Sequence, residues 1–275
     1  MREFVKMHAL GNDFAIFDGR AAPFSPDAAL IRRLADRRRG IGFDQLILVE
    51  PSTRAVARLR FFNADGSESG ACGNGTRCAA RLLAEELECD ELVLETAAGL
   101  LSCRLEEGPM VRVTMGRPRL HWRDIPLAEP RDTLSVGLGI PELPPAVAVN
   151  MGNPHAVLFV DDPDSLDAEG IGARIERHPL FPERVNVGFA RLLPDGRIRL
   201  RVYERGAGLT PACGSGACAA LVAAVRRGLV AEEARLILDG GELMVRWPAG
   251  GEVELAGPAD YSYRGEVHPG LLERA

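Results

Sequence analysis

Lysine is almost absent from this sequence. Lys6 is the only lysine in 275 residues, and every other basic residue is an arginine. An enzyme that uses pyridoxal phosphate needs a lysine to form its Schiff base. Lys6 lies near the start of the chain, away from any glycine-rich segment that could hold a phosphate group. The sequence therefore argues against pyridoxal phosphate.

Long hydrophobic runs and clusters of basic residues are also missing. The longest run of small apolar residues, 217–225, is much shorter than the roughly 20 residues that cross a bilayer. Arg2, Glu3 and Lys6 interrupt the N-terminus, which argues against a signal peptide. The formal net charge is −6 at pH 7, and no basic run could neutralise a nucleic-acid backbone. We therefore expect neither a membrane nor a nucleic acid as partner, and a cytoplasmic location.

The cysteines lack the spacing of common metal and redox sites. None of them forms the C-x-x-C pair that is typical of zinc sites and thioredoxin-like sites. An even number could indicate disulfides in a short secreted chain, but the length and the missing signal favour thiols. We expect no metal site. The six are Cys72, Cys78, Cys89, Cys103, Cys213 and Cys218.

One segment occurs twice, around Cys72 and around Cys213. Each cysteine is followed by Gly-x-Gly, and the two lie 213 − 72 = 141 residues apart. Other polar residues share this offset, which a chance repeat would not produce. These pairs are Asn12 with Asn153, Gln45 with Asn186, and Asn63 with Glu204. The constant offset indicates two copies of one structural unit.

We predict an α/β (α+β) fold of two domains related by a pseudo-twofold axis. Each domain is expected to be a mostly antiparallel sheet wrapped around a central helix, which begins directly after the cysteine. The proline-rich segment 116–145 is expected to connect the halves. Strands are expected at 59–62, 91–95, 100–105 and 111–115 in the first half, and at 198–203, 235–238, 242–247 and 251–255 in the second.

The position of each repeated cysteine favours a reactive thiol. A side chain directly before a helix lies near unpaired backbone N–H groups and the positive end of the helix dipole. Such surroundings lower a cysteine pKa from about 8.5 to roughly 3.5–7.5, and glycine backbone there can surround a carboxylate. Two such loops facing each other would place a sulfur on either side of the adjacent carbon. One thiolate could remove a proton and the opposite thiol could return one, which inverts the carbon.

The alternative interpretation of these residues is structural. A cysteine before a helix is usually a small buried residue, and we favour that interpretation for the four other cysteines. The paired amide and carboxylate residues are expected to line one cleft, although such residues often satisfy local backbone. Arg205 has no basic counterpart and is expected to bind a second substrate carboxylate, with a surface ion pair as the alternative. His155 is expected to adjust a thiol pKa, with a buried structural histidine as the alternative.

Across nearly the whole chain, these motifs resemble the diaminopimelate epimerase family. The matching segments are 6–14, 42–45, 62–68, 72–75, 152–155, 204–208 and 212–217. The resemblance implies a homodimeric, cytoplasmic isomerase without a cofactor, which converts LL- to meso-diaminopimelate in lysine and peptidoglycan precursor synthesis. It also implies that the end of the chain returns to the first domain. The expected domains are thus 1–117 with 263–275, and 118–262.

By the same resemblance, Cys72 and Cys213 are the acid–base pair, and His155 and Glu204 adjust the thiols. The expected substrate contacts are Asn12, Gln45, Asn63, Gly73, Asn74, Asn153, Asn186, Glu204, Arg205, Gly214 and Ser215. The chain departs from the family at Leu209, where the family commonly has glutamate, and this concerns the shape of the cleft. Two alternatives stay open: a racemase of the same fold for another amino acid, and a redox switch or amino-acid binding module built on the same thiols.

Overall fold

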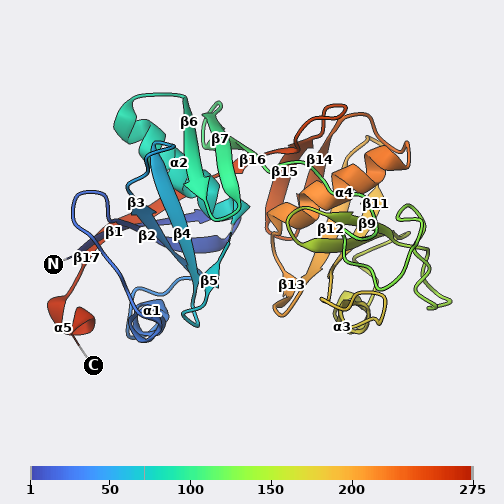
Figure 1. Cartoon of the computed structure of the whole chain (residues 1–275), viewed down its shortest axis with the longest axis horizontal. Coiled ribbons are helices and arrows are strands. Elements are labelled where there is room, and N and C mark those ends of the chain that lie inside the picture. The colour runs from blue at the N-terminus through green and yellow to red at the C-terminus, as the bar shows by residue number, and fades with distance from the viewer. Residues whose placement is uncertain (1, 71, 274–275) are drawn as a thin grey trace. The chain divides into compact units, whose positions relative to one another are not determined.

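The computed structural model describes residues 2–70 and 72–273, and the chain divides into two compact units (Figure 1). Unit 1 comprises Met1–Val113 and Gly257–Ala275, and unit 2 comprises Thr114–Ala256. The expected boundaries followed residues 117 and 262. The observed changes fall instead inside strands β8 (Met110–Thr114) and β16 (Glu254–Pro258). A boundary within a continuous strand has no turn residues to mark it in the sequence.

Unit 1 is built from strands that surround helix α2. Strands β2 and β3 and strands β4 and β6 run parallel, and β1–β2, β3–β4, β6–β7 and β7–β8 are antiparallel. Helix α2 contacts β1, β2, β3, β6 and β7. The elements besides β8 are β1 (Arg2–Ala9), β2 (Asn12–Asp18), α1 (Ala28–Ala35), β3 (Gln45–Glu50), β4 (Ala57–Asn63), β5 (Glu68–Ser69), α2 (Gly73–Leu87), β6 (Glu91–Thr96), β7 (Gly99–Leu105), β17 (Asp260–Val267) and α5 (Pro269–Leu272).

The C-terminal strand β17 completes unit 1 by pairing with the N-terminal strand. The ladder is antiparallel and runs from Arg2 opposite Val267 to His8 opposite Asp260. The Phe4 ring on β1 packs edge-on against the Tyr263 ring on β17, with 5.9 Å between the ring centroids. The Phe17 ring lies 5.8 Å from the Phe4 ring on the same measure. The first and the last described strands therefore pair in one sheet.

Unit 2 repeats this arrangement around helix α4. Strands β10 and β11 and strands β12 and β14 run parallel, and the remaining neighbours are antiparallel. Helix α4 contacts β9, β10, β11, β12, β14 and β15. The elements besides β16 are β9 (Val147–Asn150), β10 (Pro154–Phe159), α3 (Ala168–Glu176), β11 (Asn186–Leu192), β12 (Ile198–Glu204), β13 (Gly208–Thr210), α4 (Gly214–Arg226), β14 (Glu233–Leu238) and β15 (Gly241–Arg246).

The two units repeat one order of elements at the offset found in the sequence. Strand β12 begins 198 − 57 = 141 residues after β4, and α4 begins 214 − 73 = 141 residues after α2. Sheets with mostly antiparallel neighbours surround one helix in each unit, so the predicted fold class is confirmed. One strand was placed wrongly: the segment expected at 251–255 begins only at Glu254. Residues before it form a turn, closed by the Gly251 N–H donating to the Pro248 carbonyl at 2.9 Å.

Helix α4 is an almost fully buried helix. Its small apolar residues from Ala217 to Ala224 are all buried, which is why it can lie among so many strands. Among the described residues, the structure has no helix of sufficient length and apolar character to span a membrane.

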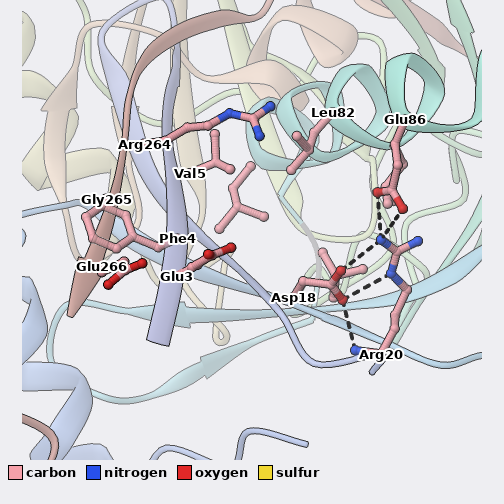
Figure 2. A pocket seen from close by; sticks show the side chains of 13 residues that line it. Glu3, Phe4, Val5, Asp18, Arg20, Leu82, Glu86, Arg264, Gly265 and Glu266 are labelled. Carbon is pink, nitrogen blue, oxygen red and sulfur yellow. Dashed lines mark hydrogen bonds and ion pairs between the residues drawn. The ribbon is translucent and has the colours of Figure 1, made fainter. Parts of the chain in front are cut away.

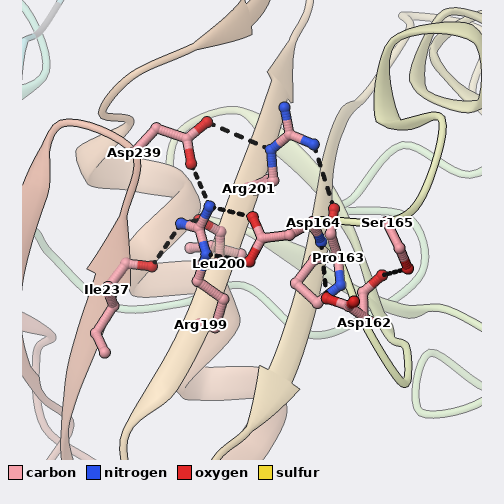
Figure 3. A network of polar contacts seen from close by, with 9 residues as sticks. All are labelled: Asp162, Pro163, Asp164, Ser165, Arg199, Leu200, Arg201, Ile237 and Asp239. Carbon is pink, nitrogen blue, oxygen red and sulfur yellow. Dashed lines mark hydrogen bonds and ion pairs between the residues drawn. The ribbon is translucent and has the colours of Figure 1, made fainter.

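An arginine network ties the strands of unit 2 together (Figure 3). Arg199 on β12 binds the carboxylates of Asp164 and Asp239, and its Nη1 donates to the Ile237 carbonyl at 3.1 Å. Arg201 donates to the second oxygen of Asp239 at 3.3 Å. These bonds join β12 to the end of β14 and to the loop before α3, and they fix the strand that carries Glu204 at its far end.

Candidate functional site

Cys72 is the N-cap of helix α2. Its backbone is extended, with φ −149° and ψ 108°, and its sulfur accepts a hydrogen bond from the Gly75 N–H at 3.3 Å. This bond satisfies one of the N–H groups that a helix start leaves without an intrahelical partner. The sulfur therefore lies at the positive end of the helix, as the sequence indicated.

Cys213 occupies the same position on helix α4. Its backbone is extended, with φ −119° and ψ 109°, and its sulfur accepts from the Gly216 N–H at 3.4 Å. The Ser215 hydroxyl lies 3.6 Å from the same sulfur. Gly73 and Gly214 are the first residues of the two helices. The repeated motif thus builds the same cysteine cap twice, once in each unit.

The second glycine of each motif lets the helix start pack closely on the sheet. A Cβ at Gly75 would lie 2.9 Å from the ring of Phe61, and a Cβ at Gly216 would lie 2.9 Å from a methyl group of Val202. Side chains essentially never approach so closely, so only glycine fits without a shift of the core. The helix start that each cysteine caps is therefore held against a strand, β4 in unit 1 and β12 in unit 2.

Burial makes Cys213 a thiol. Its side chain is only 4% exposed. Desolvation and the nearby Glu204 carboxylate raise the pKa of Cys213 well above its ordinary value, and the hydrogen bonds from Ser215 and Gly216 offset this only in part. At Cys213, burial therefore outweighs the preference for the thiolate that the helix start provides. Burial is a tertiary property, which the local sequence does not reveal.

Three of the other cysteines are buried in the core, as expected. Cys78, Cys103 and Cys218 are at most 2% exposed, and Cys89 is partly exposed. Burial raises the pKa of Cys103 to about 12 and also raises the pKa of Cys78. These two thiols are therefore unreactive at neutral pH.

In unit 1 the structure brings Asn12 to Asn74 and Gln45 to Asn63. The Asn12 oxygen accepts from the Asn74 amide at 3.2 Å, and the Gln45 amide donates to the Asn63 oxygen at 2.8 Å. Asn74 is the second residue of α2, two positions after Cys72. The buried Oε1 of Gln45 has no hydrogen-bond donor among the described residues, so an acceptor is available beside the cysteine helix.

A partly exposed ion network holds Asn12, and its members were not predicted from the sequence. Asp44 accepts from the Asn12 amide at 2.9 Å and pairs with Arg37 at 2.8 Å. Arg37 and Lys6 both pair with Asp13. Burial raises the pKa of Asp13, but hydrogen bonds from Arg37 and Lys6 outweigh it and lower the pKa to about 2. The single lysine of the chain is 6% exposed and serves this network. Their positions in the sequence could have indicated Asp13 and Asp44, because Asp13 follows Asn12 and Asp44 precedes Gln45.

In unit 2 the structure brings Asn153, His155 and Ser215 together. The Asn153 oxygen lies 2.9 Å from His155 Nε2, and its amide donates to the Ser215 hydroxyl at 3.4 Å. His155 is fully buried, and desolvation together with the nearby positive charge of Arg205 lowers its pKa to about 3. The ring is therefore neutral, and Asn153 links it to the helix start that carries Cys213.

Asn186, Glu204 and Arg205 lie at the ends of neighbouring strands. The Asn186 amide donates to the Pro154 carbonyl at 3.1 Å, and its oxygen accepts from the Arg205 backbone N–H at 2.9 Å. Arg205 Nη1 donates to the Glu183 carbonyl at 2.8 Å. The side chain of Asn186 thus ties β10 to the end of β12 and positions the backbone that follows Glu204.

A separate cavity of about 500 Å³ lies in unit 1 (Figure 2). It is lined by β1, β2, β17 and α2, and Arg20 closes one side by binding both Asp18 and Glu86. None of the residues selected from the sequence lines it. In the described part of the chain, no group of three or more His, Cys, Asp or Glu residues could hold a metal ion.

Comparison with known proteins relates the chain to one family over most of its length. The family model described as diaminopimelate epimerase matches residues 4–121 and 147–261. A diaminopimelate epimerase of Acidiphilium cryptum is 53% identical over 98% of both chains. Another, of Phenylobacterium zucineum, is 54% identical over 97% of this chain and 98% of its own.

Solved structures with low sequence identity share the fold. A hydroxyproline epimerase of Agrobacterium vitis is 19% identical, with a TM-score of 0.66 over 97% of this chain and 90% of its own. A phenazine biosynthesis protein of Bacillus anthracis is 18% identical, with a TM-score of 0.68 over 97% and 99% of the two chains. The resemblance noted in the sequence is confirmed: this chain belongs to the diaminopimelate epimerase family.

Proposed function

We propose that this protein interconverts LL- and meso-diaminopimelate without a cofactor, with Cys72 and Cys213 as its acid–base pair. Family membership over nearly the full chain supports the substrate and the reaction. The single observation that supports the chemistry best is the duplicated cap: each cysteine sulfur accepts from the backbone N–H three residues ahead at a helix start. Two sulfurs that cap equivalent helix starts suit a reaction that is run in both directions at one carbon.

The reaction consists of two proton transfers at one carbon. The Cys72 thiolate removes the α-hydrogen, so a C–H bond breaks and an S–H bond forms. The carbanion then takes the proton of Cys213 on its opposite face, and Cys213 becomes the thiolate. Backbone N–H groups at the helix starts stabilise the negative charge that spreads onto the α-carboxylate. Because burial keeps Cys213 protonated at rest, Cys72 acts first as the base, and the epimer of opposite configuration is bound after the roles have exchanged.

The substrate ligands come from both cysteine loops and from the strand ends beside them. Arg205 binds the distal carboxylate: its guanidinium has five donors, and one of them bonds to the Glu183 carbonyl. His155 and Glu204 set the protonation of the thiols. The contacts in unit 1 are Asn12, Gln45, Asn63, Gly73 and Asn74, and those in unit 2 are Asn153, Asn186, Glu204, Arg205, Gly214 and Ser215.

We further propose that the protein acts in the cytoplasm as a homodimer and needs no pyridoxal phosphate. The single lysine supports the last point, because Lys6 is buried and paired with Asp13. Analytical ultracentrifugation of the purified protein measures the dimer. A monomer at all concentrations would contradict it.

Substitution of the two cysteines tests the proposed function. Cys72→Ala and Cys213→Ala are each expected to abolish the conversion of LL- to meso-diaminopimelate under reducing conditions, measured by chiral chromatography. Cys103→Ala is the matched control, since Cys103 is a buried thiol of unit 1 on β7, and it is expected to keep wild-type turnover. Substantial turnover by either of the first two variants would contradict the scheme. If the wild-type protein converted another amino acid and not diaminopimelate, the proposed substrate would be wrong.

A further inference from the structure

We propose that Thr210 is a positioning residue that holds the Glu204 carboxylate against the Cys213 thiol. This inference rests on the proposed function, in which Glu204 sets the protonation of Cys213. Thr210 touches neither the substrate nor the Cys213 sulfur; it acts on the sulfur through the Glu204 carboxylate.

The register of strands β12 and β13 places Thr210 on the same face as Glu204. Val202 lies opposite Thr210, and Glu204 lies opposite Gly208. Alternate residues of a strand share a face, so Val202, Glu204 and Thr210 point to one side. Gly208, with φ +82°, has no side chain to occupy the space directly across from the carboxylate. The threonine hydroxyl reaches diagonally and donates to Glu204 Oε1 at 2.5 Å.

The same face meets the start of helix α4. Gly216 approaches Val202 so closely that a Cβ would be 2.9 Å from its methyl group, and the Cys213 sulfur lies 3.3 Å from that position. Val202 thus packs on the helix start that Cys213 caps, and Glu204 follows Val202 by two residues on the same face; the charge of its carboxylate raises the pKa of Cys213. Thr210 therefore bonds to the carboxylate whose charge acts on Cys213, and it occupies only one carboxylate oxygen, so lone pairs remain for the S–H group.

The neighbouring charged side chains are directed to other partners. Arg205 donates to the Glu183 carbonyl. From helix α3, Glu176 accepts from the Gly206 N–H at 2.9 Å and pairs with Arg177 and Arg184. Glu169 of the same helix accepts from the Leu209 N–H at 3.4 Å, and His155 of β10 is neutral and bonds to Asn153. Orientation of Glu204 thus falls to the hydroxyl of Thr210.

Unit 1 lacks this pair at the corresponding positions. The offset of 141 relates Glu204 to Asn63 and Thr210 to Ser69, since 204 − 63 = 210 − 69 = 141. The Asn63 oxygen accepts from Gln45, and its amide donates to the Ser67 hydroxyl at 3.0 Å. A neutral amide therefore stands where unit 2 has a carboxylate. The Thr210–Glu204 pair makes the surroundings of the two cysteines unequal, and it favours the proton on Cys213.

The position of the Glu204 carboxylate affects how easily the Cys213 thiol ionises. A carboxylate held beside a thiol disfavours the thiolate, because two negative charges would then be adjacent. If Thr210 loses its hydroxyl, Glu204 is free to turn away, and Cys213 ionises more easily. Hydrogen bonds to charged groups are the stronger kind, so the effect should be measurable at the sulfur.

The test compares Thr210→Val, which removes the donor and keeps the shape, with Thr210→Ser, which restores the donor. Iodoacetamide alkylates the thiolate, and peptide mass spectrometry reports Cys213 and Cys72 separately across the pH range of the titration. In Thr210→Val we expect Cys213 to be alkylated about tenfold faster below its midpoint, with the midpoint at lower pH. Cys72 should keep its profile, and Thr210→Ser should return Cys213 to the wild-type profile. Epimerase kcat should fall about tenfold to a hundredfold in Thr210→Val.

Ser52→Ala is the matched control. The Ser52 hydroxyl donates to Glu95 Oε2 at 2.6 Å, which is the same kind of bond in unit 1 without a cysteine partner. It should leave both alkylation profiles unchanged. Glu204→Gln, which removes the charge, should shift Cys213 in the same direction as Thr210→Val, and it serves if the valine variant does not fold. A wild-type Cys213 profile in Thr210→Val, or a valine-like profile in Thr210→Ser, would overturn the proposal. Alkylation needs no substrate, so this result is independent of whether the wild type acts on diaminopimelate.

Discussion

The close contact between Gly216 and Val202 predicts that alanine at position 216 destabilises unit 2. A Cβ there would lie 2.9 Å and 3.1 Å from the two methyl groups of Val202 and 3.3 Å from the Cys213 sulfur. Val202 is 1% exposed, so it has little room to move. Overpacking of a core costs about 1–3 kcal/mol, whereas alanine restricts the unfolded chain and recovers roughly 0.4–1 kcal/mol. We expect Gly216→Ala to lower the free energy of unfolding by about 1–2 kcal/mol.

Urea unfolding followed by circular dichroism measures this difference. Gly137→Ala is the matched control: it also lies in unit 2, but a Cβ at Gly137 would meet nothing within 4 Å. This variant should be unchanged or slightly more stable than the wild type. Gly216→Ala should also lose epimerase activity, because a shift of the helix start moves the sulfur of Cys213. A Gly216→Ala variant as stable as Gly137→Ala would refute the reasoning that glycine is required there for packing.

Three further substitutions test the ion networks and the buried histidine. Lys6→Met removes one of the two cations that pair with Asp13. Removing a partner from a buried pair costs about 3–5 kcal/mol, but Arg37 remains, so we expect the free energy of unfolding in urea at pH 7 to fall by about 3 kcal/mol or less. An unchanged free energy of unfolding would show that Arg37 alone neutralises the site. The pKa of His155 is lowered to about 3. Below about pH 6.5 the unfolded chain therefore binds a proton at this histidine and the folded chain does not, so the free energy of unfolding falls as the pH falls, by up to about 1.4 kcal/mol per pH unit. His155→Gln should flatten that part of the stability–pH curve, and an unchanged slope would contradict the neutral ring. Arg199→Gln breaks the bonds to Asp164 and Asp239 and should cost about 1–3 kcal/mol in thermal or urea unfolding, whereas wild-type stability would mean that the network is only a surface feature.

Much of the fold was visible in the sequence because it was present twice. The shared offset of Cys72 and Cys213 located both central helices at their first residue, and the apolar pattern located strands β4, β6, β7, β8, β12, β14 and β15. The exception at Glu254 arose where a turn at Pro248 delayed the strand. Local patterns report local structure well, and repetition raises their specificity.

The site was less accessible, since its electrostatics depend on burial and on contacts between distant segments. The pKa of Cys213 is raised although the helix start alone favours the thiolate, because desolvation outweighs the local N–H groups. Lys6 could be excluded as a cofactor lysine, but its pairing with Asp13 and the link from Arg37 through Asp44 to Asn12 required the folded chain. Thr210 was likewise visible only once β13 was placed beside β12.

Isotope incorporation in the first turnovers tests most directly whether two separate thiols act on one carbon. LL-diaminopimelate is incubated with the reduced enzyme in deuterated water, and product and remaining substrate are separated and analysed by mass spectrometry. Proton removal by Cys72 and delivery by Cys213 predict meso product that carries deuterium at the inverted carbon from the first turnover, while the remaining LL substrate keeps its hydrogen. Deuterium entering the remaining substrate as fast as the product, or product that keeps the original hydrogen, would indicate a single base and would contradict the account.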